Sequence, residues 1–280
     1  MLIGQVLQMH FDEVWFLQFS PNGNYLASSS KDESAIIWEV TDGGVVSFKH
    51  ILGHQKPVLT VSWIPNDEKL LTCGEEEVIK RWDVNSGRLL HIYVKTGVGF
   101  ISCTWCPVGF ILAGTTDESI SLWNFEGEEL DCWKDETLRV SEMAVTEDGT
   151  RILSIYQKRS IAVIDRKTKE LLKLLPQANV ITSFSSYKIP IYQQILFWWI
   201  EETFIASGTE DSQVYIWHRA SGMPVVRLWN EHPGSVNCVS WNPENIYMLD
   251  TASDDHKIVI WCPPNDPVTE VESAGQEMRG

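Results

Sequence analysis

The sequence predicts an all-β fold, a β-propeller of six to seven blades in which each blade is a four-stranded antiparallel sheet. The first observation behind this prediction is a tryptophan that closes an apolar run about every forty residues. The second is an acidic residue six positions before each of these tryptophans, and the third is an alternating run ahead of it that usually stops at a proline. A unit of this size cannot bury both faces of its sheet alone, whereas several units around one axis can.

The tryptophan repeat is the strongest signal along the chain. The residues that close the apolar runs are Trp38, Trp82, Trp123, Trp217 and Trp261. The acidic residues six positions earlier are Asp32, Glu76, Asp117, Asp211 and Asp255. The long gap between Trp123 and Trp217 divides at residues 160–165, which show the same strand pattern with Ile164 in the tryptophan position. Six units therefore follow one another along the chain.

Residues near the N-terminus are expected to complete the last blade. The final unit ends at Trp261, directly after a third strand, and residues 3–8 match the outer-strand position that residues 225–228 hold in the unit before. Pairing of the first and last strands would remove a free sheet edge. The period alone also allows a sandwich or a solenoid, but the phase of the two chain ends favours a ring.

The stretch between Ile164 and Trp217 does not fit the period. It is 53 residues long (217 − 164), which is too long for one blade and too short for two. Residues 185–200 have no clear turn signal, no acidic residue and no blade-like alternation. We therefore expect an irregular insertion or deletion near 185–202, a partial fifth blade, and a ring that is six-bladed, strained or open. The propeller is expected to span residues 1–262, and residues 263–280 are expected to form a disordered acidic tail.

The charge balance restricts the classes of partner. Lys plus Arg is 22 and Asp plus Glu is 38, which gives a net charge of −16. Nucleic acids and anionic membranes attract basic surfaces, so neither is expected as a partner. The longest uncharged apolar run, residues 189–200, is too short to span a bilayer, and no secretory signal is expected at the start. The six cysteines are interpreted as free thiols of a cytoplasmic protein, with the nucleus as a second location.

The sequence offers no clear catalytic motif, so no enzyme activity, cofactor, metal or small-molecule substrate is expected. A Gly-x-Ser-x-Gly motif, a phosphate-binding glycine loop and a dinucleotide fingerprint are all missing from it. Cys103 and Cys106 form a Cys-x-x-Cys pair, but the second pair that a zinc site needs is missing from the sequence. Their position in a strand predicts that both are buried thiols of the core. The turn aspartates recur once per blade, which indicates structure, because an active site occurs once. A propeller hydrolase or lyase would instead need one convergent pocket in the central channel.

The repeats resemble those of WD-repeat proteins, over residues 1 to about 262. In that family a histidine, a serine or threonine, an aspartate and a tryptophan form a buried hydrogen-bonded set in each blade. The resemblance implies three such sets here: His10, Ser28, Asp32 and Trp38; His54, Thr72, Glu76 and Trp82; and His232, Thr251, Asp255 and Trp261. Such a set is physically sensible, because a buried indole N–H and a buried imidazole both need hydrogen-bond partners.

Longer segments narrow the resemblance. Residues 12–20, 31–39, 56–63 and 207–219 are similar to the family of WD repeat-containing protein 26, especially its plant members. That family is similar to subunits of the C-terminal-to-LisH (CTLH) ubiquitin ligase, known in yeast as the glucose-induced degradation complex. The resemblance implies a non-enzymatic scaffold or substrate receptor, which binds other ligase subunits and proteins destined for proteasomal degradation.

Two departures from the family leave alternatives open. Family members carry a LisH and CTLH helical region ahead of a seven-bladed propeller, whereas this chain is expected to begin at the first propeller strand and shows six units. The alternatives are a general WD-repeat adaptor in signalling or transcriptional regulation, and a truncated, poorly functional paralogue.

The partner-binding surface is expected on one rim of the propeller, where the inner strands begin beside the acidic turns. The residues at these positions are Glu13, Trp15, Lys31, Lys56, Leu59, Glu75, Thr116, Glu210, Asn237 and Asp254. Trp15 stands out, because an exposed aromatic side chain is typical of interface hot spots. Packing of Trp15 against a neighbouring blade is the alternative interpretation.

Overall fold

The computed structural model describes residues 1–41, 44–134, 138–146, 148–156, 160–169, 171–176, 204–218, 223–228, 232–245 and 247–262. Within these ranges the chain forms strands β1 to β23 and no helix. The irregular segment expected near 185–202 and the tail expected over 263–280 lie outside the described residues.

The first half of the chain forms three four-stranded antiparallel sheets. Their strands are β2 (Val14–Phe19), β3 (Tyr25–Ser30), β4 (Ser34–Val40) and β5 (Val46–Gly53); β6 (Val58–Trp63), β7 (Lys69–Gly74), β8 (Val78–Asp83) and β9 (Leu89–Val94); and β10 (Phe100–Cys106), β11 (Phe110–Thr115), β12 (Ser119–Trp123) and β13 (Glu129–Lys134). In each sheet the strands pair in sequence order, so every sheet is one continuous stretch of chain folded by short turns. Asn22 and Gly23 make the first of these turns, and Gly23 adopts the positive φ of 70° that glycine tolerates.

The second half adds three further sheets. The fourth contains β14 (Leu138–Val145), β15 (Arg151–Tyr156), β16 (Ser160–Asp165) and β17 (Leu171–Pro176), and the fifth contains β18 (Phe204–Gly208), β19 (Val214–His218) and β20 (Met223–Leu228). The last sheet has the order β1-β23-β22-β21, from β1 (Leu2–Leu7), β21 (Val236–Trp241), β22 (Leu249–Ser253) and β23 (Ile258–Cys262). The predicted partial blade is the sheet of β18–β20, and residues 177–203 ahead of it lie outside the described part of the chain.

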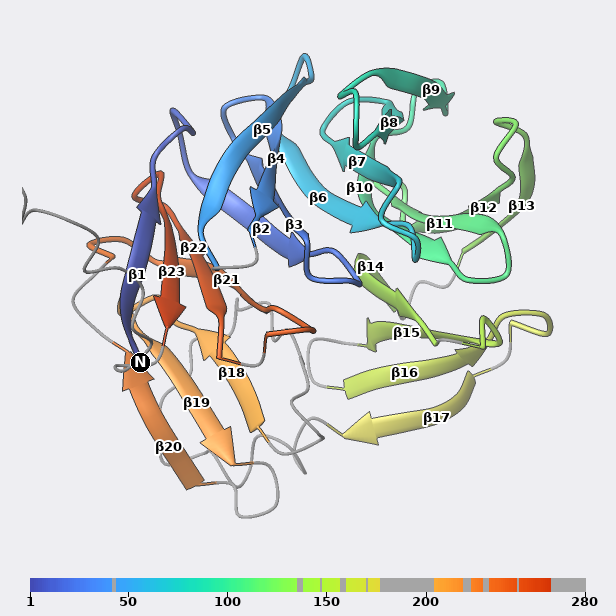
Figure 1. The fold of residues 1–280 in the computed structure, drawn as a ribbon. Coiled ribbons are helices and arrows are strands. Elements are labelled where there is room, and N and C mark those ends of the chain that lie inside the picture. The colour runs from blue at the N-terminus through green and yellow to red at the C-terminus, as the bar shows by residue number, and fades with distance from the viewer. Residues whose placement is uncertain are drawn as a thin grey trace, which may run out of the picture.

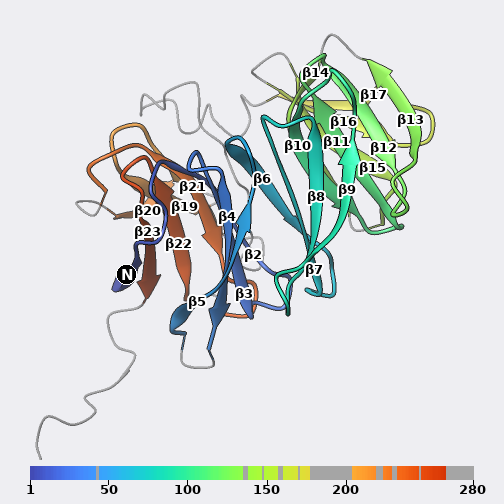
Figure 2. The same cartoon turned by 90° about the horizontal axis from the view of Figure 1, so that it is seen from above.

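The six sheets are set in turn around a common centre as the blades of a propeller (Figure 1). Strand β2 contacts β21 on one side and β6 on the other, β10 contacts β6 and β14, and β18 contacts β21. Figure 2 shows the sheet of β2–β5 standing between the last sheet and the sheet of β6–β9. The sheets of β2–β5, β6–β9 and β10–β13 and the last sheet therefore each have a neighbour on both faces, as the apolar repeats require.

The start of the chain supplies the outer strand of the last sheet. Strand β1 pairs antiparallel with β23, with Val6 opposite Val259 and Leu7 opposite Ile258. The outer strand predicted at residues 3–8 is thus confirmed, shifted by one residue. Backbone hydrogen bonds between β1 and β23 join the first strand of the chain to the last one, and β1 covers the edge that β23 would otherwise leave unpaired.

Hydrogen bonds also tie inner strands of neighbouring sheets to one another. The Phe19 amide of β2 donates to Ser240 Oγ of β21 over 3.2 Å, and the Trp105 amide of β10 donates to Ser62 Oγ of β6 over 3.1 Å. An inner strand has a ladder partner on one side only, so the hydroxyl groups of the preceding sheet satisfy some of its remaining amides. These bonds set the register of one sheet against the next.

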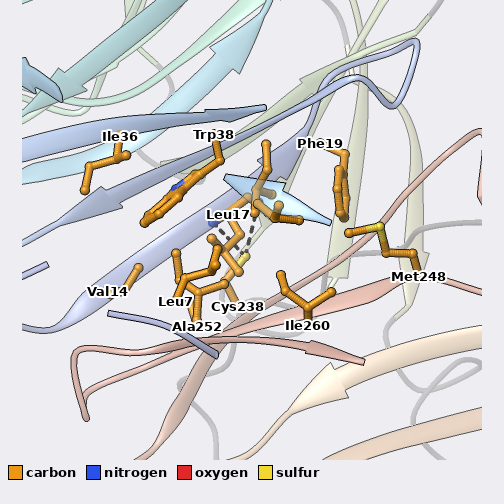
Figure 3. Packing of buried hydrophobic residues seen from close by; sticks show 13 residues of the cluster. Leu7, Val14, Leu17, Phe19, Ile36, Trp38, Cys238, Met248, Ala252 and Ile260 are labelled. Carbon is orange, nitrogen blue, oxygen red and sulfur yellow. Dashed lines mark hydrogen bonds between the residues drawn. The ribbon is translucent and has the colours of Figure 1, made fainter. Parts of the chain in front are cut away.

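An apolar cluster fills the junction between the sheet of β2–β5 and the last sheet (Figure 3). Leu17 and Phe19 of β2 face Cys238, Met248 and Ile260 of the last sheet, and all five side chains are buried. Complete burial of one such apolar side chain contributes roughly 1.5–3 kcal/mol. The cluster therefore stabilises the place where the first and last sheets meet.

Asp250 is the exception in this junction. It lies on β22 between Met248 and Ala252, which belong to the apolar cluster, and its side chain is completely buried. Neither carboxyl oxygen has a hydrogen-bond partner within the described residues. Burial raises the pKa of Asp250 well above its ordinary value. Because Ala27 and Ala206 hold the matching positions in two other sheets, the fold does not require a polar side chain here.

Replacement of Asp250 by alanine is expected to stabilise the protein by about 1–3 kcal/mol at pH 7, because the variant no longer buries an unpartnered carboxyl group. The gain should grow as the pH rises above about 4. In that range the unfolded state ionises Asp250 while the folded state keeps it protonated, so the wild type loses stability with rising pH. Urea denaturation of both proteins between pH 4 and 8 measures this gain, and a gain that stays constant with pH would contradict the account.

Candidate interaction surface

A chain of hydrogen bonds joins four side chains in the sheet of β2–β5. Trp38 Nε1 donates to Ser28 Oγ over 3.0 Å. Ser28 Oγ lies 2.8 Å from His10 Nε2, and His10 Nδ1 lies 2.8 Å from Asp32 Oδ2. A neutral imidazole that carries its proton on Nδ1 satisfies all of these groups, since the serine hydroxyl then donates to Nε2 and Nδ1 donates to the carboxylate. The set connects β3, β4 and the segment that leads into β2.

Asp32 fixes the backbone at the start of the inner strand as well as the histidine. Burial raises the pKa of Asp32, but the hydrogen bond from His10, with further hydrogen bonds from Ser34 and the Phe11 amide, outweighs burial and holds the pKa well below its ordinary value. The Phe11 amide donates to Asp32 Oδ2 over 2.9 Å. The carboxylate therefore positions the chain where the predicted rim begins.

The last sheet repeats this arrangement. Trp261 Nε1 donates to Thr251 Oγ1 over 3.0 Å, and Thr251 Oγ1 lies 2.8 Å from His232 Nε2. His232 Nδ1 lies 3.0 Å from Asp255 Oδ2. Burial raises the pKa of Asp255, and the hydrogen bond and charge of His232 outweigh it, so that the pKa is lowered overall. Two of the three predicted sets thus have the same geometry in sheets that lie side by side.

The set in the sheet of β6–β9 differs at its acidic end. Trp82 Nε1 donates to Thr72 Oγ1 over 2.8 Å, and Thr72 Oγ1 lies 2.7 Å from His54 Nε2. His54 Nδ1 is 3.6 Å from Glu76 Oε1, which is too far for a hydrogen bond. The glutamate is one methylene longer than aspartate, and its carboxylate does not complete the chain.

Lys80 accounts for the different position of the Glu76 carboxylate. Its ammonium group lies 3.2 Å from Glu76 Oε2 and donates to the Gly53 carbonyl oxygen over 3.1 Å. The matching strand position holds the apolar Ile36 in the sheet of β2–β5, where the aspartate has no such competitor. Burial and the charge of Lys80 lower the pKa of His54. The Glu76 carboxylate therefore forms an ion pair with the buried lysine in place of a hydrogen bond to His54.

The sheet of β10–β13 uses another acceptor for its tryptophan. Ala113 stands at the position that Ser28 holds in the sheet of β2–β5, so no hydroxyl is available there. Trp123 Nε1 donates instead to Ser121 Oγ over 2.9 Å. Sequence reasoning missed Ser121, although the alanine ten residues before Trp123 was a signal that another acceptor must exist.

The turn aspartates keep a local role in these sheets. Asp117 Oδ1 accepts hydrogen bonds from Thr115 Oγ1 over 2.6 Å and from Ser119 Oγ over 2.7 Å. These bonds hold the pKa of Asp117 well below its ordinary value. Asp211 accepts a hydrogen bond from Thr209 in the same way. The carboxylates close the turns between second and third strands, as expected for a repeated structural group.

Four of the inner strands carry a β-bulge next to their first residue, at the predicted rim. The register shifts beside Trp15 in β2, Leu59 in β6, Ile101 in β10 and Asn237 in β21. A bulge re-aims the side chain of the extra residue, so these four positions form a matched set at one edge of the propeller. Three of them were predicted from the sequence. Ile101 was missed, although it follows Phe100 as Trp15 follows Val14.

Trp15 is half-buried and joins a small polar group on this rim. Its Nε1 donates to Glu13 Oε2 over 2.9 Å, and Lys31 Nζ donates to Glu13 Oε1 over 2.7 Å. These two hydrogen bonds hold the pKa of Glu13 below its ordinary value. Phe11 precedes Glu13 by two residues in the chain and is 86% exposed, the largest exposure among the large apolar side chains described. The rim of the first sheet thus combines two aromatic side chains with a charged pair.

The other predicted rim residues are more dispersed. Asn237 Nδ2 donates to the Val14 carbonyl oxygen over 3.0 Å and to Asp254 Oδ1 over 2.7 Å, so this pair spans the junction between the first and last sheets. Thr116 Oγ1 accepts a hydrogen bond from the Gly99 amide. The exposed members of the predicted rim are Lys31, Lys56, Glu75, Thr116 and Glu210, and the half-buried members are Glu13, Trp15, Leu59, Asn237 and Asp254.

Other kinds of site find little support in the described residues. Among them, no three His, Cys, Asp or Glu side chains gather closely enough to hold a metal ion. In the same part of the chain no helix has the length and apolar character needed to cross a membrane. Cys103 and Cys106 are both buried in the strand.

The three polar sets coincide with a known repeat. The family described as "WD domain, G-beta repeat" matches residues 3–39, 46–83 and 223–262, and each of these stretches contains the four residues of one set. This chain is a WD-repeat protein. The all-β sheets of the structure are those of a WD-repeat propeller.

Three curated proteins are similar to the WD-repeat chain over most of its length. It is 47% identical, over 92% of the chain and 50% of the relative, to a WD repeat-containing protein 26 homolog of Arabidopsis thaliana. It is 39% identical, over 94% of the chain and 58% of the relative, to a WD repeat-containing protein WDS homolog of the same plant. It is 31% identical, over 94% of the chain and 59% of the relative, to GID complex subunit 7 of Schizosaccharomyces pombe.

These similarities confirm the resemblance to the family of WD repeat-containing protein 26. The chain spans between one half and three fifths of the length of these relatives.

Replacement of Ser28 by alanine is expected to destabilise the protein by about 2–3 kcal/mol, because the Trp38 N–H and the His10 imidazole both lose a buried partner. Ser47 lies exposed on β5 of the same sheet, and its replacement by alanine should change stability by less than about 0.5 kcal/mol. Thermal or urea denaturation of the two variants provides the comparison. Equal stability of the two variants would show that the buried chain of hydrogen bonds contributes nothing to the fold.

Proposed function

We propose that this protein is a non-enzymatic scaffold that recruits protein substrates to a CTLH-type ubiquitin ligase, or holds subunits of that ligase together. The observation that carries the proposal is the similarity over nearly the whole chain to a protein described as GID complex subunit 7 and to a WD repeat-containing protein 26 homolog. The proposed partners are other ligase subunits and proteins that the ligase marks for degradation.

The chemistry of the rim suits a protein partner. Trp15 and Phe11 supply aromatic surface, and the Glu13–Lys31 pair beside them supplies charge. Partly exposed aromatic groups with a polar surround are typical of hot spots in protein interfaces. The net charge of −16 disfavours nucleic acid and anionic membranes, and it favours basic segments of protein partners. We place the protein in the cytoplasm, with the nucleus as a second location, and propose no cofactor, metal or small-molecule substrate.

Affinity purification of the tagged full chain from its native cells, followed by mass spectrometry, tests this function. The proposal expects LisH-containing and RING-type ligase subunits among the enriched proteins, because a scaffold of this complex must bind them. Recovery of the folded chain with a reproducible set of signalling or transcription proteins, and with no ligase subunit, would instead identify a general WD-repeat adaptor and overturn the ligase proposal.

Replacement of Trp15 by alanine is expected to weaken binding of the enriched partners roughly tenfold or more, as for other aromatic hot spots. The melting temperature should change little, because Trp15 is half-buried and lies outside the apolar clusters between the sheets. Tyr247 is a matched control, since it is an exposed aromatic residue in the turn after β21, at the other edge of the propeller. Binding that is reduced equally by both alanine variants would exclude a specific role for the rim.

A further inference from the structure

Two thiols lie near the same hydroxyl group, that of Thr60, at the junction between the sheets of β6–β9 and β10–β13. Cys73 lies on β7 and Cys103 lies on the inner strand β10, and they are 0% and 5% exposed. Thr60 Oγ1 is 3.2 Å from Cys73 Sγ and 3.9 Å from Cys103 Sγ. The hydroxyl group of Thr60 is therefore close to both sulfur atoms. Both sulfur atoms belong to the apolar cluster that holds these two sheets together.

This pairing of sulfur atoms sets the junction apart from its counterparts. In register, Cys103 takes the place that Leu17 holds in β2 and Val61 holds in β6. Cys73 takes the place of Ser29 in β3 and Ala252 in β22. The junction between the last sheet and the sheet of β2–β5 therefore has no cysteine at these two positions. The junction between the sheets of β2–β5 and β6–β9 has none there either. Packing alone does not demand two thiols here.

The surroundings of Cys103 make its thiol slow to react in the folded protein. The neighbouring Cys73 thiol and burial raise the pKa of the Cys103 thiol, and the Thr60 hydroxyl group offsets only part of this effect. A thiol attacks an oxidant as the thiolate, so a buried thiol with a raised pKa reacts slowly at neutral pH. Oxidation would then follow a transient separation of the two sheets, which admits water and lets one thiol ionise.

We propose that Cys73 and Cys103 are a redox modification site, at which a peroxide produces a reversible disulfide that staples two neighbouring blades. One thiolate attacks an oxygen of hydrogen peroxide, which breaks the O–O bond, forms a sulfenic acid and releases, after protonation, one water molecule. The second thiolate attacks the sulfenic sulfur, the S–S bond forms, and the hydroxyl leaves as a second water molecule. Two thiols and one peroxide thus give one disulfide and two waters, and a dithiol reductant reverses the reaction.

The disulfide would make the propeller more rigid. It joins an inner strand to the second strand of the preceding blade, so the two sheets can no longer separate without breaking a covalent bond. A cross-link of this kind restricts the unfolded chain, which raises the melting temperature if the native geometry is kept. The oxidised propeller is therefore the stiffer form and the reduced propeller is the form whose blades can separate.

The test is treatment of the folded full chain with hydrogen peroxide at pH 7 and pH 8.5, followed by denaturation, alkylation and peptide mapping. The expected product is an intramolecular peptide pair that links Cys73 to Cys103, appears faster at the higher pH and disappears with dithiothreitol. Its melting temperature should exceed that of the reduced protein. The exposed Cys132 reports within the same sample that the oxidant is active.

Two variants separate the cross-link from side effects on folding. Cys103→Val and Cys73→Ala introduce the residues that Val61 and Ala252 supply at matching positions, so both should fold, and neither should gain stability on oxidation. Cys238→Ala, in the junction of the first and last sheets, serves as control and should still form the Cys73–Cys103 link. The proposal is overturned if Cys132 is oxidised while Cys73 and Cys103 are both recovered as alkylated thiols, or if the linked protein melts no higher than the reduced one.

Discussion

A sheet of this protein has two apolar faces and needs a neighbour on each side to cover them. That constraint explains why the apolar clusters lie between sheets rather than within any single one. It also explains why β1, at the start of the chain, pairs with β23, because the last sheet would otherwise end in an unpaired strand. The position of the rim follows from the same packing, because the inner strands begin where neighbouring sheets are held in register.

The buried polar sets add specific hydrogen bonds to this apolar packing. In the sets around Ser28 and Thr251, a tryptophan, a hydroxyl, a histidine and a carboxylate are all satisfied, and the carboxylate of Asp32 also holds the backbone that enters β2. Where the set changes, other groups fill the role: Lys80 pairs with Glu76, and Ser121 accepts from Trp123. His54 Nδ1 keeps no hydrogen-bond partner within the described residues, so the propeller also tolerates an incomplete set. A scaffold with a rigid frame and variable edges suits the proposed recruitment of protein partners.

Sequence patterns predicted what depends on residues close together in the chain. The tryptophan period located the third strand of most sheets, and the phase of the chain ends predicted the pairing of β1 with β23. The set that contains Ser28 and Trp38 was implied by the resemblance to WD-repeat proteins, and these two residues lie in one hairpin. The features that were missed arise where two sheets meet. The isolation of Asp250, the ion pair of Lys80 with Glu76 and the approach of Cys73 and Cys103 to Thr60 all depend on side-chain lengths and on neighbouring sheets, which a repeat pattern does not specify.

The pairing of the two chain ends can be tested by a single engineered cross-link. A Cβ atom at Gly4 of β1 would lie 3.5 Å from Cys262 Cβ of β23, a separation at which disulfides form. The Gly4→Cys variant should therefore oxidise in the folded state to a disulfide between the introduced thiol and Cys262, detected by peptide mapping without reductant. Gly53→Cys, placed on β5 where a Cβ has open space, should form no such link. A folded Gly4→Cys protein that leaves both thiols free under oxidising conditions would show that β1 does not close the propeller.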